Sequence, residues 1–268
     1  MGVAPMSVHY NNFYANTLGR SVNVNVILPE PLNPTGEVAA DYASGHQLLP
    51  TIWLLHGLGG DATTWLRNTT IEALATQYRV AVVMPQTERG FYTDMVSGPK
   101  YWTFLTRELP ERLRFMFPLS EAPADNVVVG NSMGGYGALR WALTYPDRFA
   151  AVAALSPVTD LGRFRVEQAT MMPDFDLAFD PQHLEDSPVS LGYLLARVPA
   201  DTDLRVLMTT GSQDMLRAMD VAMRPRLAAK FGNQFTWDEL PGRHDWPLWN
   251  QQLGMVMHWL YRGTFKAI

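Results

Sequence analysis

Cysteine is absent from this 268-residue chain. Disulfides, thiolate metal sites and cysteine nucleophiles are therefore excluded, and the redox state of the compartment leaves no trace in the sequence. Apolar runs of membrane-spanning length, about 18 residues, are also absent, so the sequence predicts no membrane span. The N-terminal segment has neither the basic start nor the apolar stretch of a secretory signal, and we expect a cytoplasmic protein.

Long runs of like charge are missing as well. The net charge is -5 and charged residues make up 18% of the chain, which offers no electrostatic footprint for nucleic acid or an anionic membrane. A neutral or modestly polar small molecule is the expected partner. Hydrophobic residues make up 47%, enough to bury a substantial core. We expect residues 1–268 to fold as a single α/β domain.

Short apolar runs alternate with helix-like segments over most of the chain. Strands buried on both faces have such continuous apolar sequences, and the alternation predicts a mostly parallel sheet with helices on both faces. The earlier segment 21–29 alternates polar and β-branched residues, which predicts an antiparallel edge strand. Buried strands are predicted at 51–55, 80–84, 127–130, 150–155 and 204–209, with a strand-like segment at 234–239. Helices are predicted at 69–77, 102–115, 136–145, 219–231 and 251–261.

Two segments do not fit this alternation. Residues 29–50 carry four prolines and scattered polar residues, which predicts a surface loop. Residues 159–199 contain several prolines with acidic and aromatic residues between them. We interpret this second segment as an insertion over one end of the sheet, acting as a lid or pocket wall. Its Met171, Met172 and Phe175 either line an apolar acyl site or pack the insertion onto the core.

A serine flanked by glycines follows the strand predicted at 127–130. The stretch Gly130-Asn131-Ser132-Met133-Gly134 fits G-x-S-x-G, the nucleophile elbow, in which a strand turns sharply into a helix and presents the serine hydroxyl. The pattern alone is weak, but here an apolar strand leads in and a helix-compatible segment leads out as far as Pro146. We therefore predict Ser132 as a nucleophile.

A serine nucleophile needs a histidine to accept its proton and a carboxylate to hold that histidine in the correct tautomer. Among the six histidines, His244 lies in a late loop just after the strand-like segment 234–239, where it can reach the elbow. It is the predicted base. His258 falls in a predicted helix and is interpreted as a packed or surface side chain. Two others precede the predicted sheet and one lies in the insertion, namely His9, His46 and His183.

Three aspartates come into question as the acid. Asp214 follows the strand at 204–209 through a glycine-containing turn, which places its carboxylate at the same strand end as the elbow. The order Ser, Asp, His also matches the order of the triad in this fold pattern. Asp160, after the preceding strand, is the alternative. Asp203 precedes its strand and should lie at the opposite edge.

An oxyanion hole requires backbone N–H donors, one of them from the residue after the nucleophile, here Met133. The second donor comes from an upstream loop. His56-Gly57-Leu58-Gly59-Gly60 follows the strand at 51–55, and its glycines permit close approach of the backbone. Leu58 is the candidate donor, and His56 is interpreted as a brace for the loop.

Together these motifs resemble the esterase D superfamily of α/β-hydrolases, and within it the tributyrin-esterase group. The resemblance implies an α/β-hydrolase fold, no cofactor, a preference for short acyl chains and a homo-oligomer. It assigns a catalytic triad to Ser132, Asp214 and His244, and the oxyanion hole to Leu58 and Met133. The widely spaced histidines favour no metal site. The resemblance rests on His56-Gly57-Leu58-Gly59-Gly60, Trp65, Val82-Val83-Met84-Pro85, Gly90-Phe91-Tyr92-Thr93-Asp94, Gly130 to Gly137 and His244-Asp245-Trp246-Pro247-Leu248-Trp249.

The function predicted from these residues is that of a serine carboxylesterase that hydrolyses short-chain acyl esters through an acyl-enzyme on Ser132. Acetylated sugars and phenolic esters are open as substrates, because residues 29–50 and 159–199 contribute no motif to the resemblance. Two alternatives stay open at this stage. One is an acyltransferase that uses the same acyl-enzyme, and the other is a non-catalytic relative that serves as a binding protein.

Overall fold

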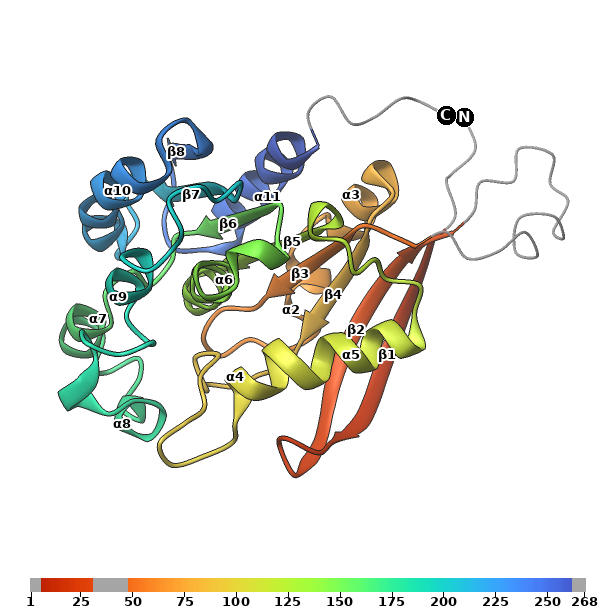
Figure 1. Cartoon of the computed structure of the whole chain (residues 1–268), viewed down its shortest axis with the longest axis horizontal. Coiled ribbons are helices and arrows are strands. Elements are labelled where there is room, and N and C mark those ends of the chain that lie inside the picture. The colour runs from red at the N-terminus through yellow and green to blue at the C-terminus, as the bar shows by residue number, and fades with distance from the viewer. Residues whose placement is uncertain (1–5, 31–47, 262–268) are drawn as a thin grey trace, which may run out of the picture.

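The computed structural model describes residues 6–30 and 48–261. Its centre is an eight-stranded sheet in the order β1-β2-β4-β3-β5-β6-β7-β8 (Figure 1). Strands β1 and β2 are antiparallel to their neighbours, and the other six are parallel to one another. The strands are β1 (Met6–Ala15), β2 (Arg20–Pro29), β3 (Thr51–Leu55), β4 (Ala81–Pro85), β5 (Asn126–Asn131), β6 (Ala151–Leu155), β7 (Arg205–Gly211) and β8 (Phe235–Leu240). The predicted mostly parallel sheet is confirmed.

Helices cover both faces of the sheet (Figure 1). Strand β5 shows why its sequence is a continuous apolar run: Val128 packs into the core on one face, and Val127 and Val129 pack into the core on the other. One core includes side chains from α5 (Leu109–Met116), α6 (Met133–Thr144) and α10 (Arg217–Phe231). The opposite core includes side chains from α2 (Thr64–Asn68), α3 (Ile71–Tyr78) and α11 (Trp246–Leu260). Helix α5 continues α4 (Tyr101–Thr103) and a π-helical turn (Phe104–Glu108).

The N-terminal edge of the sheet differs from the prediction. Segment 21–29 does form an antiparallel strand, β2, but β2 pairs with β1 on one side and β4 on the other, so it is not the edge. The edge is β1, which the sequence analysis missed because its asparagines and exposed tyrosines give little apolar alternation. His9 therefore lies within the sheet, where its ring packs against Phe117 with centroids 5.2 Å apart.

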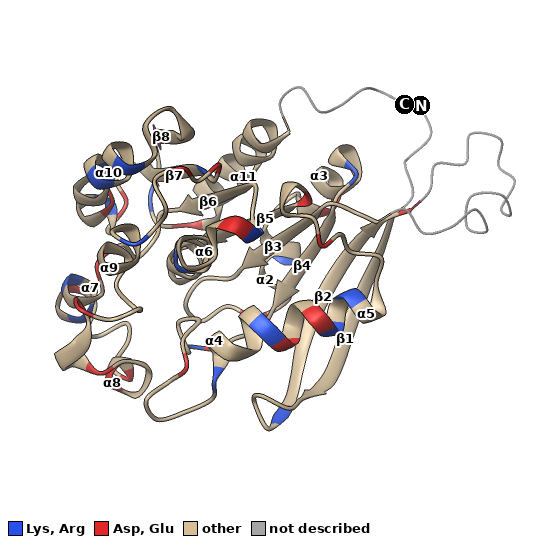
Figure 2. Ribbon diagram, in the orientation of Figure 1, with Lys and Arg blue, Asp and Glu red and all other residues tan. Residues whose placement is uncertain are grey.

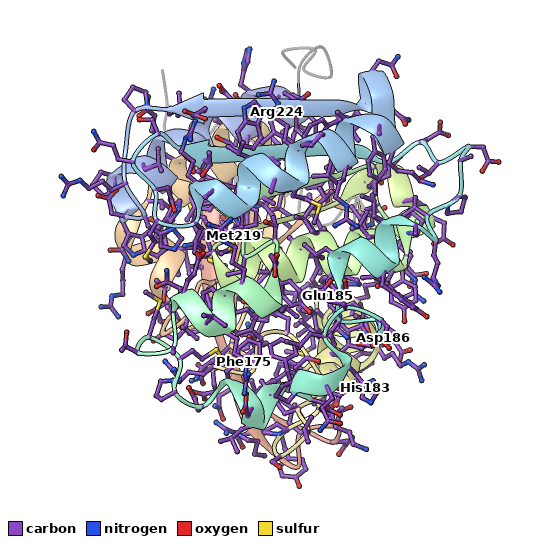
Figure 3. All side chains as sticks on the ribbon, turned by 90° about the vertical axis from the view of Figure 1, so that its left-hand side faces the viewer. Phe175, His183, Glu185, Asp186, Met219 and Arg224 are labelled. Carbon is purple, nitrogen blue, oxygen red and sulfur yellow. The ribbon has the colours of Figure 1, made fainter. Side chains whose placement is uncertain are left out.

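The insertion at 159–199 contains short helices, α7 (Leu161–Glu167), α8 (Phe175–Ala178) and α9 (Leu191–Leu195). Helices this short are held by packing and capping, so they leave little periodicity in the sequence. Met172 and Phe175 are buried in the core, where Phe175 packs against Phe91, and Met171 is partly exposed. Figure 3 looks onto this side of the molecule, with Phe175 and His183 on the insertion and Met219 on α10.

Charged residues are spread over the helices rather than gathered by sign. Figure 2 shows both signs alternating along α5. Within the described residues, no helix is both long and apolar enough to span a membrane. His46 and most of the loop predicted at 29–50 lie outside the described residues.

Candidate active site

Ser132 lies in the turn between β5 and α6, with φ 55° and ψ -119°. A non-glycine residue rarely adopts this conformation, and the surrounding structure must hold it there. The N–H of Ser132 donates to the carbonyl of Leu155 at the end of β6, and its carbonyl accepts from the N–H of Val158 and of Tyr136. These bonds hold the serine at the carboxyl edge of the sheet.

Two glycines allow the turn to pack tightly. A Cβ atom on Gly134 would lie 2.2 Å from the carbonyl oxygen of Leu55, and one on Gly130 would lie 2.3 Å from the carbonyl oxygen of Gly134. Both contacts are with backbone, which cannot rotate away as a side chain can. The helix after the serine therefore sits directly against β3 and β5 only because these positions carry no side chain.

We expect Gly134→Ala to destabilise the protein by about 1–3 kcal/mol, because the added methyl group forces β3 and α6 apart. It should also shift Ser132, the predicted nucleophile. Gly254→Ala is the matched control, since nothing lies within 4 Å of a Cβ at that position in α11. A helical alanine there should gain up to about 1 kcal/mol. Urea unfolding measures both, and equal shifts in the same direction would contradict the prediction.

His244 lies in the loop before α11 and contacts both of its predicted partners. Its Nε2 atom is 2.8 Å from the Oγ atom of Ser132, and its Nδ1 atom is 2.9 Å and 3.0 Å from the two carboxylate oxygens of Asp214. An ionised carboxylate can only accept, so Nδ1 carries the proton and Nε2 is free to accept the serine hydroxyl. The structure thus brings Ser132, His244 and Asp214 together from three separate loops.

Asp214 follows β7 and is held in a largely buried position. Burial acts to raise its pKa, but the hydrogen bond and charge of His244, together with donors at Leu216 and Ser156, outweigh it and leave the pKa below its ordinary value. The N–H of Leu216 donates to Oδ1 at 2.8 Å. Asp214 is therefore ionised at neutral pH and can orient the imidazole.

The other candidate side chains lie elsewhere. Asp160 caps α7, where its Oδ1 atom accepts the N–H of Arg163 at 2.8 Å. Asp203 is exposed ahead of β7, and His258 is exposed on α11. His183 is exposed in the insertion beside Asp186. Of the three candidate acids, all within the described residues, only Asp214 forms a hydrogen bond with His244.

The loop at 56–60 lies beside the elbow. A Cβ atom on Gly57 would be 3.5 Å from the Cβ atom of Ser132, so the backbone that leads to Leu58 passes next to the nucleophile. Met133 is the first residue of α6, where N–H groups have no acceptor within the helix. The two segments predicted to supply the oxyanion donors thus lie next to Ser132.

His56 braces this loop rather than exchanging protons. Its Nε2 atom accepts the N–H of Thr87 at 3.1 Å, so the ring proton lies on Nδ1, which donates to the carbonyl of Gly57 at 2.8 Å. Burial lowers the pKa of His56. The carbonyl of His56 accepts the phenol hydroxyl of Tyr92 at 2.8 Å. The neutral ring thus links the loop at 56–60 to the loop that contains Thr87.

A buried arginine in α6 joins the insertion to these loops. Arg140 donates to the carbonyl of Tyr92 at 2.9 Å and to the carbonyl of Pro188 at 3.1 Å. Its guanidinium lies over the ring of Trp102, 4.0 Å from the centroid. Burial lowers the pKa of Arg140. The insertion is therefore fastened to the same loop that supports His56.

Sequence reasoning missed a buried carboxyl group near Asp214. Asp220, in the first turns of α10, has no exposed surface, and its neighbours include the hydroxyls of Thr210 and Thr159. Burial, opposed by these hydroxyls and reinforced by the charge of Asp214, raises the pKa of Asp220 well above its ordinary value. An aspartate at the start of a helix is ordinary in a sequence, so no local signal marks this one.

We expect Asp220→Asn to stabilise the protein at pH 7 and to have little effect near pH 4. Because the folded-state pKa is raised, the unfolded chain loses this proton at lower pH than the folded protein does. Above about pH 3.9 this difference favours unfolding, and each unit of pKa difference lowers the free energy of unfolding by up to about 1.4 kcal/mol. The amide removes that cost. Melting temperatures at both pH values measure it, with exposed Asp203→Asn as the control. A gain that is equal at both pH values would contradict the prediction.

A family of putative esterases matches residues 15–260. The chain belongs to this esterase family. An acetyl esterase from Caldicellulosiruptor saccharolyticus is 28% identical to this esterase over 269 residues, which cover 95% of this chain and 98% of that protein.

Two solved structures are similar over the same length. FphF, a fluorophosphonate-binding serine hydrolase of Staphylococcus aureus, is 30% identical with a TM-score of 0.81, over 96% of this chain and 98% of that one. The S-formylglutathione hydrolase FrmB of Staphylococcus aureus is 28% identical with a TM-score of 0.79, over 96% and 99%. The predicted esterase D resemblance and α/β-hydrolase fold are confirmed. This esterase is a serine hydrolase that acts on carboxylic esters.

Proposed function

We propose that this esterase cleaves short-chain acyl esters through an acyl-enzyme on Ser132, with His244 as the base and Asp214 as the acid that orients it. The observation that carries the proposal is the pair of contacts at His244, 2.8 Å to the serine hydroxyl and 2.9 Å to the carboxylate. Both distances are within the reach that proton transfer and tautomer control require.

The reaction proceeds in two halves. His244 takes the proton of Ser132 as the hydroxyl oxygen attacks the ester carbonyl carbon, and the N–H groups of Leu58 and Met133 bind the resulting oxyanion. The carbon–oxygen bond to the alcohol then breaks, and the imidazolium gives its proton to the leaving alcohol. Water attacks the acyl-enzyme with His244 again as the base, and the carboxylic acid leaves as Ser132 regains its proton.

Short acyl chains suit both the site and its relatives. Ser132 is buried, with 7% of its surface exposed. The relative from Caldicellulosiruptor saccharolyticus, which is similar over nearly the whole chain, is an acetyl esterase. We place this protein with the tributyrin esterases on the motifs that carry the resemblance, and acetylated sugars and phenolic esters stay in competition as natural substrates. The insertion at 159–199, fastened by Arg140, is proposed as a wall of the pocket.

The test is a series of p-nitrophenyl esters of increasing chain length, run beside methyl ferulate and an acetylated sugar. We expect the highest kcat/KM for the acetate or butyrate and a steady fall for longer chains. The highest kcat/KM on a long-chain ester, or turnover of the ferulate alone, would contradict the short-chain proposal. Labelling by a fluorophosphonate, with Ser132 located by peptide mapping, tests the nucleophile in the same preparation.

No observation favours transfer of the acyl group to another alcohol over hydrolysis by water. Product analysis with added alcohols would detect such a transferase. Location in the cytoplasm, assembly into a homo-oligomer and folding as one domain stay predictions.

A further inference from the structure

The imidazole of His244 has a third neighbour besides its two hydrogen-bond partners. Trp249 packs against it with ring centroids 4.9 Å apart and an interplanar angle of 84°. The hydrogen bonds to Ser132 and Asp214 act at the two ring nitrogens, and weak bonds of this kind permit small shifts of the ring through the His244 side-chain torsions. Packing against a rigid indole limits those shifts, and Trp249 is itself held in place because its side chain is only 7% exposed.

Trp249 is the first member of a chain of perpendicular rings. Trp246, three residues earlier in α11, packs against Trp249 at 5.0 Å and 82°. Trp65 in α2 packs against Trp246 at 5.2 Å and 86°. Edge-to-face contacts of this kind are favoured by the charge distribution of aromatic rings. Three tryptophans from two helices therefore form one continuous bridge that starts at His244.

The bridge ends at the start of the loop at 56–60. Trp65 is 1% exposed, and its Nε1–H donates to the carbonyl of Leu55 at 3.1 Å. Leu55 is the last residue of β3, and the segment that leads to Leu58 begins immediately after it. The bridge therefore spans the site from the imidazole to the backbone that supports the oxyanion donor.

Hydrogen bonding does not explain the position of Trp249. Its Nε1 atom is buried and has no hydrogen-bond partner among the described residues. An unpaired buried donor is unfavourable, so the contribution of this side chain comes from the packing of its ring. Phe in place of Trp249 would keep an aromatic ring and remove the unpaired donor.

We propose that Trp249 is a positioning residue for His244, and that the bridge of Trp249, Trp246 and Trp65 sets the imidazole against the loop at 56–60. The inference rests on the roles proposed above for Ser132 and His244. The bridge acts through His244, because Trp249 packs against the imidazole and carries no group that exchanges a proton with Ser132. Its effect is on kcat, because a base that is displaced by about 1 Å can cost 100-fold in rate while substrate binding is unchanged.

The test compares Trp249→Leu with Trp249→Phe in p-nitrophenyl acetate hydrolysis. We expect Trp249→Leu to lower kcat by about 10- to 100-fold with little change in KM, and Trp249→Phe to recover most of the loss. Trp259→Leu is the matched control, since Trp259 lies on the same helix but bonds to Thr236 away from the site. Its kcat should equal that of the wild type.

Proton NMR supplies a readout that a general loss of stability would not move. The deshielded Nδ1–H proton between His244 and Asp214 should broaden in Trp249→Leu and stay sharp in Trp249→Phe and Trp259→Leu. If Trp249→Leu does not fold, Trp246→Leu takes its place, because Trp246 is only partly buried. This substitution removes the ring that packs against Trp249, and it should lower kcat by several-fold with the same broadening of the proton resonance.

Wild-type kcat and a sharp proton resonance in the leucine variant would overturn the inference. Equal losses in Trp249→Leu and Trp259→Leu would overturn it as well, because they would indicate a general effect on α11. Ser132→Ala and His244→Ala in the same assay separate this failure from that of the proposed function. If they remain active, the proposed function is wrong. If they are inactive while Trp249→Leu is fully active, only the bridge is wrong.

Discussion

Ser132→Ala is expected to lower kcat for p-nitrophenyl acetate by about a million-fold, the size of effect seen when a triad nucleophile is removed. The reason is that His244 points its Nε2 atom at this oxygen, at 2.8 Å, and the elbow holds the serine in a strained turn. What activity is left should reflect only substrate binding and oxyanion donors. Initial rates over a range of enzyme concentrations measure it.

The control for this prediction is Ser187→Ala, a partly exposed serine in the insertion whose hydroxyl donates to the carbonyl of His183. It should hydrolyse the ester at the wild-type rate. Urea unfolding should show little change for Ser132→Ala, because alanine and serine occupy the strained turn at similar cost. Activity within about ten-fold of wild type in a folded Ser132→Ala protein would show that the nucleophile lies elsewhere.

Asp214→Asn is expected to lower kcat by about 10⁴-fold while the fold is retained. The two carboxylate oxygens of Asp214 lie 2.9 Å and 3.0 Å from Nδ1 of His244, so the ring proton stays on that nitrogen. An amide can donate to Nδ1 instead and so favours the tautomer with the proton on Nε2, which cannot accept the proton of Ser132. Steady-state kinetics on the same ester measure the loss.

Asp160→Asn is the matched control, because it makes the same chemical change at the aspartate that was the alternative acid. Asp160 caps α7, and asparagine caps a helix about as well as aspartate does. Activity should therefore stay near wild type. A larger loss in Asp160→Asn than in Asp214→Asn would assign the acid to Asp160 instead.

The nucleophile turn could be predicted from sequence because its chemistry is local. A turn as tight as the one at Ser132 needs glycine where neighbouring backbones meet, and Gly130 and Gly134 stand at those points. The strand before it could be predicted for a similar reason, since a strand with both faces buried has an apolar side chain at nearly every position. The loop at 56–60 carries its own glycines in the same way.

The choice between the acids shows where local reasoning ends. Asp214 and Asp160 each follow a parallel strand, so each lies at the correct edge of the sheet. Their loops lead in different directions, and only the path of the chain after β7 brings a carboxylate to His244. The order Ser, Asp, His along the chain favoured Asp214, but this order does not give the distance between a carboxylate and His244.

By itself the sequence determined the parallel sheet, the turn at Ser132 and the family. The sheet follows from continuous runs of apolar residues, and the turn and the family follow from motifs of residues close together in the chain. Only the tertiary structure decided that β1 is the edge strand, that Asp220 is buried beside the acid, and that Trp249 faces His244. These facts depend on pairing and burial between distant segments. The stability that such a contact provides depends on both residues being packed together. The sequence around either residue alone therefore does not reveal the contact.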